Sequence, residues 1–466
     1  MVLKGMIKNV FSNLPYGVQR FLILPYAFIV NKEDRRIDNC LLKKVVIDES
    51  LDSSFIKFKK LINYAYEHVP YYRNTWKSIG ITPQDIKLNS DIAKLPIIDK
   101  QTVKEYYNEF VSDEVNINDL IEHPSGGSSG INLTILYDDN TVRARRLGIL
   151  RWLNFAGLNS RDKGVWLGRA HKTLFQDKIK WGERGEKFFG YYNPVSNRLQ
   201  LATNNMTPDV LEHYVSNIKK FKPAYIQGYP ASIAALARYM DTKYDCYQMK
   251  AVLTSSEVLT ASDRKVIEKV FRCKVFDRYG LGEEVASAIE CECHDGYHIE
   301  IDRCYVEVTD ECGNILEDHI GDIVGTNLEN YAFPLIRYKT GDLGSIKYEG
   351  CACGRKLPII SELIGRGSEY LVDKYYVNQT EEPVSQSIVI PDGVLAYQIE
   401  QIKIDDFVVR FCSNSTTDLS MQIMIAVKKY VEEQLHIDNP KIKVLQCRNI
   451  PVSANGKMKY LISHVQ

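Results

Sequence analysis

The hydrophobic positions of residues 53–69 recur at the alternating three- and four-residue spacing of an amphipathic helix. They are Phe55, Phe58, Ile62, Ala65 and Val69. Pro70 follows, and proline lacks the amide hydrogen that the interior of a helix requires. The pattern therefore predicts a helix that buries one face and ends before residue 70.

Shorter apolar runs farther along the chain predict strands, and they are AVLTSSEVL, KVFDRYGLG and CYVEVTD. Between the first two, SDRKVIEKVF predicts a helix with Ser262 as its N-cap. Helices alternating with strands indicate an α/β layered fold. The character of the chain changes after Gly365 and Arg366, which predicts a large multi-subdomain N-terminal domain, 1–366, and a small α+β C-terminal domain, 367–466.

Charge and cysteine content exclude several classes of protein. The 466 residues include 59 basic and 59 acidic side chains, so no net field would recruit nucleic acid. Eleven irregularly spaced cysteines do not suit a disulfide framework, which favours the cytoplasm. The apolar run Phe21–Val30 is too short to span a membrane, which predicts no transmembrane segment. Packing on the protein is the first interpretation of this run, and peripheral membrane contact is the alternative.

Three serines and three glycines dominate the stretch HPSGGSSG, and the alternating stretch 131–137 after it predicts a strand. Glycine lets a backbone approach an anion closely, and amide and hydroxyl groups donate to phosphate oxygens. The pattern lacks the Lys-Ser/Thr pair of a Walker A loop, and it does not open a helix as a dinucleotide fingerprint does. It predicts a polyphosphate-binding loop between strands, with an ordinary Ser/Gly turn as the alternative.

Polar clusters follow the predicted strands, and they are TSSE (254–257), YGLGEE (279–284) and RYKTGD (337–342). Ligands bind at strand ends in α/β sheets. Tyr279 can stack on a purine, Glu283 can bind a divalent ion, and Asp342 can accept two ribose hydroxyls. Lys457, beside Gly456, can neutralise charge during attack on a phosphorus. These side chains together predict an ATP site.

The order of these motifs resembles the adenylate-forming enzymes, which activate carboxylates as acyl-adenylates. Within that superfamily the chain is most similar to the phenylacetate–coenzyme A ligase branch, including its capsular-polysaccharide relatives of the CapK type. The branch-level motifs are YAYEHVPYYRNTW, IAKLPIIDK, GYPASI, FPLIRYKTGDLG and CACGRKLP. The resemblance extends from about residue 55 to the C-terminus.

The resemblance implies a role for each matching residue. Lys457 would bridge the carboxylate and the α-phosphate, and Glu283 would bind Mg²⁺. The C-terminal domain would swing about a hinge near Ser368 and Glu369. The ATP ligands would be Ser125, Gly126, Gly127, Ser128, Ser129 and Gly130 for the phosphates, Ser255, Ser256, Glu257, Tyr279 and Gly280 for the adenine, and Asp342 and Arg366 for the ribose.

The chain departs from the family at three places. Gly282 stands where a hydroxyl residue usually precedes the glutamate, and Ile131-Asn132 replaces the usual Lys-Pro pair. The turn after the domain break also differs, so the acceptor stays open between coenzyme A and an amine such as an amino sugar. The sequence also leaves open the identity of the acid and whether the protein forms a homodimer. Two other functions stay open as well: a nucleotidyltransferase that leaves AMP on its product, and a non-catalytic nucleotide-binding protein of a polysaccharide locus.

The cysteines predict a second site. ECECHDGYH contains Cys291, Cys293 and His298, and the later CACG contains Cys351 and Cys353. The candidate ligands are Cys293, His298, Cys351 and Cys353. Thiolates and an imidazole suit tetrahedral Zn²⁺. We predict these four residues as ligands of a structural zinc ion, with reduced, partly buried thiols as the alternative.

Overall fold

The computed structural model describes residues 38, 41, 51–125, 133–169, 191–193, 196–348, 350–366, 370–380, 384–385, 387–453 and 456–465. The chain forms two compact units, and each contains separate stretches of sequence. Unit 1 contains Gly157–Val275 and Gly367–Gln466. Unit 2 contains Asp38–Ala156 and Phe276–Arg366. The predicted hinge residues, 368 and 369, and the apolar run 21–30 lie outside the described residues.

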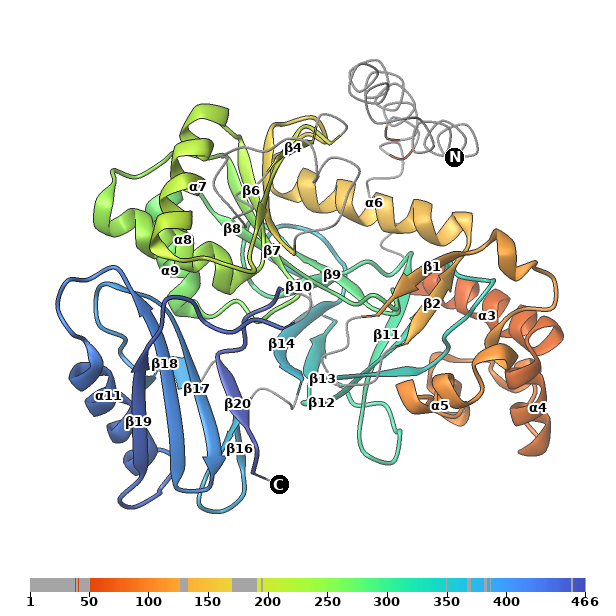
Figure 1. The fold of residues 1–466 in the computed structure, drawn as a ribbon. Coiled ribbons are helices and arrows are strands. Elements are labelled where there is room, and N and C mark those ends of the chain that lie inside the picture. The colour runs from red at the N-terminus through yellow and green to blue at the C-terminus, as the bar shows by residue number, and fades with distance from the viewer. Residues whose placement is uncertain are drawn as a thin grey trace. The chain divides into compact units, whose positions relative to one another are not determined.

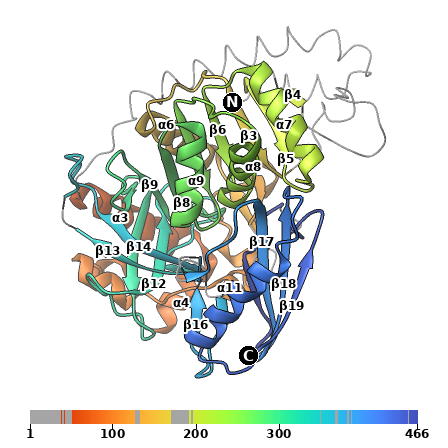
Figure 2. The same ribbon diagram turned by 90° about the vertical axis from the view of Figure 1, so that its left-hand side faces the viewer.

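The first stretch of unit 1 is an α/β layer. Its strands are parallel in the order β7, β6, β3, β5, and β4 pairs antiparallel at the edge. Helices α7, α8 and α9 lie beside these strands (Figure 2). All four residues of β6 are buried, as expected for a central parallel strand. The bounds are β3 Gly164–Gly168, β4 Tyr191–Asn193, β5 Arg198–Ala202, α7 Pro208–Phe221, β6 Tyr225–Gly228, α8 Pro230–Lys243, β7 Ala251–Ser255 and α9 Ala261–Phe271.

The second stretch of unit 1 is a smaller α+β layer. Its four-stranded sheet has the order β19, β18, β17, β20, and α11 packs against it (Figure 1). Buried side chains of this sheet, such as Ile399 and Phe411, belong to the same hydrophobic cluster as Val252 and Leu236 of the first stretch. The bounds are β15 Tyr370–Val372, β16 Asn378–Thr380, β17 Val394–Lys403, β18 Asp406–Ser413, α11 Ser420–Glu433, β19 Lys441–Gln446 and β20 Leu461–Ser463.

Unit 2 is built on strands in the order β11, β12, β13, β14, β10, β9, β8 and on a separate hairpin of β1 and β2. The helices of unit 2 precede and follow this hairpin in the chain. The helical bounds are α3 Leu51–His68, α4 Pro70–Ser78, α5 Lys100–Glu105 and α6 Asp139–Phe155, with 3₁₀ turns at Pro83–Asp85, Asn89–Lys94, Tyr107–Phe110 and Ile117–Asp119. The strand bounds are β1 Ile121–Pro124, β2 Thr134–Tyr137, β8 Val275–Gly280, β9 Ser287–Glu290, β10 Tyr297–Ile299, β11 Cys304–Thr309, β12 Gly321–Asn327, β13 Tyr338–Lys347 and β14 Ile359–Arg366.

The helices and strands predicted from the hydrophobic pattern are confirmed, but the predicted N-cap of α9 is wrong. Helix α3 ends at His68, and Pro70 begins the next helix instead of continuing the first. The three β-rich runs form β7, β8 and β11. The N-cap of α9 is Thr260 and not Ser262, because Thr260 has extended backbone angles and its side chain accepts a hydrogen bond from the Asp263 amide.

Unit 2 contains a buried ionic network, which we define as Arg151, Glu284, Glu300, Asp302 and Arg303. Arg151 on α6 donates to Glu300 at 3.0 Å and to Asp302 at 2.6 Å. Arg303 pairs with Glu300 and Glu284. Burial alone would raise the pKa of Glu300, but the nearby arginines outweigh it and lower the pKa to about 2. The network therefore ties α6 to the β9–β11 region through ion pairs.

Among the described helices, none combines the length and the apolar character that a membrane crossing requires.

Candidate functional site

The predicted phosphate loop connects β1 and β2. These strands pair antiparallel, with Pro124 opposite Thr134, and the Ser125 amide donates to the Leu133 carbonyl at 2.7 Å. The prediction that the loop lies between strands is confirmed. Gly126, Gly127, Ser128, Ser129 and Gly130 lie outside the described residues. Ser125 is buried at the base of this loop.

Side chains around the base of the loop hold the β8–β9 segment beside it. Tyr137 donates a hydrogen bond to the carbonyl of Gly282 and stacks on His123 with ring centroids 4.9 Å apart. A Cβ placed on Gly282 would lie 3.4 Å from the Ser125 Cα. Burial, together with the nearby Arg145, lowers the pKa of His123 to about 4. The residue that departs from the family pattern, Gly282, thus borders the predicted phosphate loop directly.

The predicted adenine and ribose ligands of unit 2 contact each other. The Tyr279 hydroxyl, at the end of β8, donates to Asp342 Oδ2 at 2.8 Å. Asp342 lies inside β13 and not at a strand end as the sequence suggested, and its direct partner across the β13–β14 ladder is Arg366. Gly280 ends β8 beside Tyr279. The Tyr279–Asp342 hydrogen bond and the β13–β14 ladder therefore bring together Tyr279, Asp342 and Arg366, which are far apart in sequence.

The predicted magnesium ligand, Glu283, lies in the turn after β8 and is 3% exposed. Its Oε1 is 3.5 Å from the Tyr338 hydroxyl, which belongs to the first residue of β13. Mg²⁺ is usually held by one or two carboxylates together with substrate phosphates and water. The buried carboxylate of Glu283, next to Gly282 at the base of the phosphate loop, fits that donor set.

Unit 1 carries a second group of predicted ligands, and here two distant segments meet. Lys457 Nζ donates to the carbonyl oxygen of Ser256 at 2.6 Å, across 201 positions of sequence. The next amide, that of Met458, donates to Glu257 Oε1 at 3.2 Å. Ser255 ends β7, and Ser256 has a φ of 75°, a left-handed conformation that costs a non-glycine residue energy. The predicted catalytic lysine therefore lies against the predicted adenine-binding segment.

The turn that carries Lys457 is held by its own contacts. Thr203 Oγ1 donates to the Gly456 carbonyl at 2.7 Å, and Gly456 has a φ of 76°. A Cβ at this glycine would lie 2.7 Å from Thr203 Oγ1, so the close approach requires glycine. Tyr229 lies 5.9 Å from Lys457 Nζ, measured to the ring centroid, and burial raises its pKa to about 12. Lys457 is thus positioned by backbone contacts while its amine stays partly exposed.

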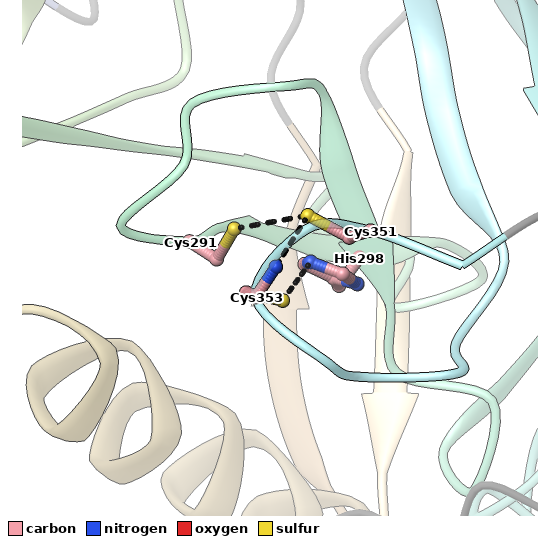
Figure 3. A group of neighbouring side chains, drawn as sticks. All are labelled: Cys291, His298, Cys351 and Cys353. Carbon is pink, nitrogen blue, oxygen red and sulfur yellow. Dashed lines mark hydrogen bonds between the residues drawn. The ribbon is translucent and has the colours of Figure 1, made fainter.

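Four sulfur and nitrogen ligands meet in unit 2, at the ends of two hairpins (Figure 3). Cys291, His298, Cys351 and Cys353 place their donor atoms within 4.8 Å of one another. Three of the four predicted zinc ligands are in this group. Cys293 is not, because the turn after β9 leaves it exposed while only its amide points back, toward Cys291 Sγ at 3.4 Å.

The thiols of this group differ in acidity. Burial raises the pKa of Cys291 and of Cys351. Burial alone would raise the pKa of Cys353 too, but hydrogen bonds involving Arg355 outweigh burial and lower the pKa of that thiol. Two of the thiols therefore resist deprotonation in the absence of a compensating cation.

Sequence reasoning missed several residues that support the predicted ligands. Tyr137, Tyr338 and Thr203 hold Gly282, Glu283 and Gly456 through single hydrogen bonds, and no motif marks them. Tyr137 was expected only as an apolar strand position. Leu136, on the other face of the strand, is buried like Tyr137. The alternation of apolar residues therefore does not indicate a separate role for the Tyr137 hydroxyl.

The chain was compared with known proteins, and similar sequences include a phenylacetate–coenzyme A ligase and CapK. No protein-family model matches the chain. It is 28% identical over 356 residues to a phenylacetate–coenzyme A ligase of Thermus thermophilus, covering 74% of this chain and 76% of that protein. It is 24% identical over 463 residues to the protein CapK of Staphylococcus aureus, covering 98% of each.

Solved structures show the same fold. A 2-hydroxyisobutyryl-CoA ligase, solved in a postadenylation state with an acyl-AMP, superimposes with a TM-score of 0.66 at 18% identity over 88% of each chain. The α/β fold class predicted from the sequence is confirmed by this likeness. By sequence the chain is therefore similar to the phenylacetate–coenzyme A ligases and to CapK, and its fold is that of an adenylate-forming ligase.

Proposed function

We propose that this protein is an ATP-dependent carboxylate ligase. In the first step the carboxylate oxygen attacks the α-phosphorus of ATP, forming acyl-AMP and releasing pyrophosphate. In the second step a thiol or an amine attacks the acyl carbon and AMP leaves. The observation that carries the proposal is the contact between Lys457 Nζ and the Ser256 carbonyl, which puts a cation next to the segment predicted to bind the base.

The chemistry expected of each group follows from its charge and its position. Lys457 would neutralise the charge that develops on the carboxylate and α-phosphate oxygens, the type of stabilisation that contributes most to phosphoryl and acyl transfer. Tyr279 would cover the adenine. Asp342, which already accepts a hydrogen bond from Tyr279, would accept the ribose hydroxyls together with Arg366. Glu283 would bind Mg²⁺ beside the phosphates.

Coenzyme A is the acceptor that the named relatives favour, because several are coenzyme A ligases. The likeness to CapK over almost the whole chain supports a role in surface polysaccharide biosynthesis, with an amine such as an amino sugar as the second candidate acceptor. The C-terminal stretch 367–466 would move between the two steps, so that Lys457 serves adenylation only.

Pyrophosphate release with hydroxylamine as the trap tests the proposal, over a panel of aryl acids, hydroxy acids, amino acids and uronic acids. We expect release with one class of acid. Lys457→Ala should lower that rate by about 100-fold or more, since removing one group that stabilises transition-state charge costs on the order of 10²–10³ in rate. Lys459→Ala, two residues away and equal in charge loss, is the matched control and should stay within about threefold.

The second step is assayed separately by supplying preformed acyl-AMP with coenzyme A or with an amine. Lys457→Ala should leave this rate nearly unchanged if the lysine serves adenylation alone. Equal adenylation by Lys457→Ala and the unmodified protein would contradict the proposed role of the lysine. AMP retained on the product would indicate a nucleotidyltransferase, and ATP binding without pyrophosphate release would indicate a non-catalytic protein.

A further inference from the structure

The group of Cys291, His298, Cys351 and Cys353 lies at the ends of two different hairpins (Figure 3). Cys291 directly follows β9, and His298 lies in β10, the next strand of that hairpin. Cys351 and Cys353 lie in the loop between β13 and β14. Strand β14 pairs with β10, with Ile359 opposite His298. The fold of unit 2 thus brings together side chains about 60 positions apart.

Two separations between donor atoms match those of a tetrahedral site, and all four donor atoms lie within 4.8 Å of one another. Zn–S bonds of about 2.3 Å and Zn–N bonds of about 2.0–2.1 Å place two sulfurs about 3.8 Å apart, and a sulfur and a nitrogen about 3.6 Å apart, at the tetrahedral angle. The distance from Cys291 Sγ to Cys351 Sγ is 3.7 Å, and that from Cys353 Sγ to His298 Nε2 is 3.4 Å. Both agree with the expected values to about 0.2 Å.

The backbone around the sulfurs is arranged for thiolates. The amide of Cys293 points at Cys291 Sγ at 3.4 Å, and the amide of Cys353 points at Cys351 Sγ at 3.5 Å. The two Cys-x-Cys turns therefore repeat the same donor geometry around their first cysteine. Hydrogen bonds of this kind orient metal ligands and stabilise their charge.

Three of the four side chains are buried, Cys353 is partly buried, and an arginine lies beside them. Cys291 is fully buried, and His298 and Cys351 are 1% and 8% exposed. The Arg355 guanidinium lies 4.2 Å from the Phe155 ring centroid, and the Phe155 ring also contacts His298 edge-on. Three thiolates, one neutral imidazole and Zn²⁺ carry a net charge of −1, and Arg355 beside them also pairs with Glu292 at 3.0 Å. With four protein ligands the site has no open position, as in structural zinc sites.

We propose that Cys291, His298 Nε2, Cys351 and Cys353 bind one structural Zn²⁺ that joins the β9–β10 loop to the β13–β14 loop. The ion would fix the ends of the strands that lead to Asp342 and Arg366. It takes no part in adenylation, so this inference stands or falls independently of the proposed function. Cys293 is excluded from the ligand set, although the sequence alone predicted it.

Elemental analysis of the full-length, untagged protein, purified without chelator, tests the site. We expect about one zinc per chain, retained in Cys293→Ser and reduced to below about 0.2 in Cys353→Ser. Cys293→Ser is the matched control, because it removes a thiol two positions from a ligand and tests the competing ligand set. Iron in place of zinc, or loss of zinc in Cys293→Ser with retention in Cys291→Ser, would overturn the assignment.

Cobalt substitution of the unmodified protein keeps the test independent of variants that fail to fold. After removal of zinc with a chelator, we expect one equivalent of Co²⁺ to give intense visible d–d bands of a tetrahedral ion and thiolate charge-transfer absorption in the near ultraviolet. Failure to bind either metal would overturn the proposal. So would a Cys291–Cys351 disulfide, detected by mass spectrometry of the unreduced protein purified under thiol-free conditions.

Discussion

The buried ionic network of unit 2 and the Lys457 contact of unit 1 use the same kinds of charged group for opposite purposes. In the network, Arg151 and Glu300 are fully buried, and each neutralises the other at 3.0 Å. Lys457 instead keeps its amine partly exposed and donates to a backbone carbonyl, that of Ser256. A charge buried against an opposite charge has little left to offer a ligand, whereas an amine that stays partly exposed can still reach an anion. Burial therefore separates charges that stabilise the fold from charges that suit catalysis.

The largest effect should come from breaking the network. Glu300→Gln leaves Arg151 and Arg303 without their shared carboxylate, and removing one partner of a buried ion pair costs about 3–5 kcal/mol. Urea denaturation of the full chain should show this loss. Lys457→Ala should change the free energy of unfolding by less than about 1 kcal/mol, as expected for a partly exposed group.

Asp322→Asn is the matched control for the network, because Asp322 pairs with the exposed Lys339 at 2.7 Å in the same unit. Its cost should stay below about 1 kcal/mol. If Glu300→Gln and Asp322→Asn destabilise the protein equally, burial does not separate the two classes of charge.

A smaller effect is expected from pH, through His123 at the base of the phosphate loop. The pKa of His123 in the folded protein is about 4, below its unperturbed value of about 6.5. The unfolded chain therefore takes up this proton first as pH falls. The stabilising contribution is fully present above about pH 6.5 and is lost as pH falls toward 4.

Denaturation curves between pH 7 and 4 measure this dependence. His123→Phe keeps an aromatic ring against Tyr137 but cannot titrate, so its stability should fall less steeply over that range. The same slope in both proteins would mean that His123 is protonated as easily in the folded chain as in the unfolded one, and would argue against its burial.

The smallest effect is expected at Gly282, where the family usually has a hydroxyl residue. A Cβ there would lie 3.4 Å from the Ser125 Cα, close to the limit of comfortable contact. Gly282→Ser should therefore fold and add a donor near the phosphates, raising kcat/KM for ATP by a few-fold, up to about tenfold, as one hydrogen bond to a charged group allows. Gly282→Ala adds the same Cβ without the hydroxyl and is the matched control. An equal change in both variants would assign the effect to packing.

The sequence predicted the elements that local physics controls. Helix α3 followed from the spacing of its apolar residues and from Pro70, and the loop between β1 and β2 followed from its small residues and the strand after it. Helix capping was less certain, because both Thr260 and Ser262 can cap α9 and only the backbone angles choose between them.

The order of the motifs was enough to predict nucleotide chemistry and the family, since the types of residue that bind phosphate, base, ribose and metal are set by chemistry. Only the tertiary structure decided which of these residues meet. Lys457 reaches Ser256, and Asp342 receives the Tyr279 hydroxyl from inside a strand, because sheet pairing brings distant segments together. Local spacing could not distinguish Cys291 from Cys293, since the choice depends on which side chain the turn after β9 buries.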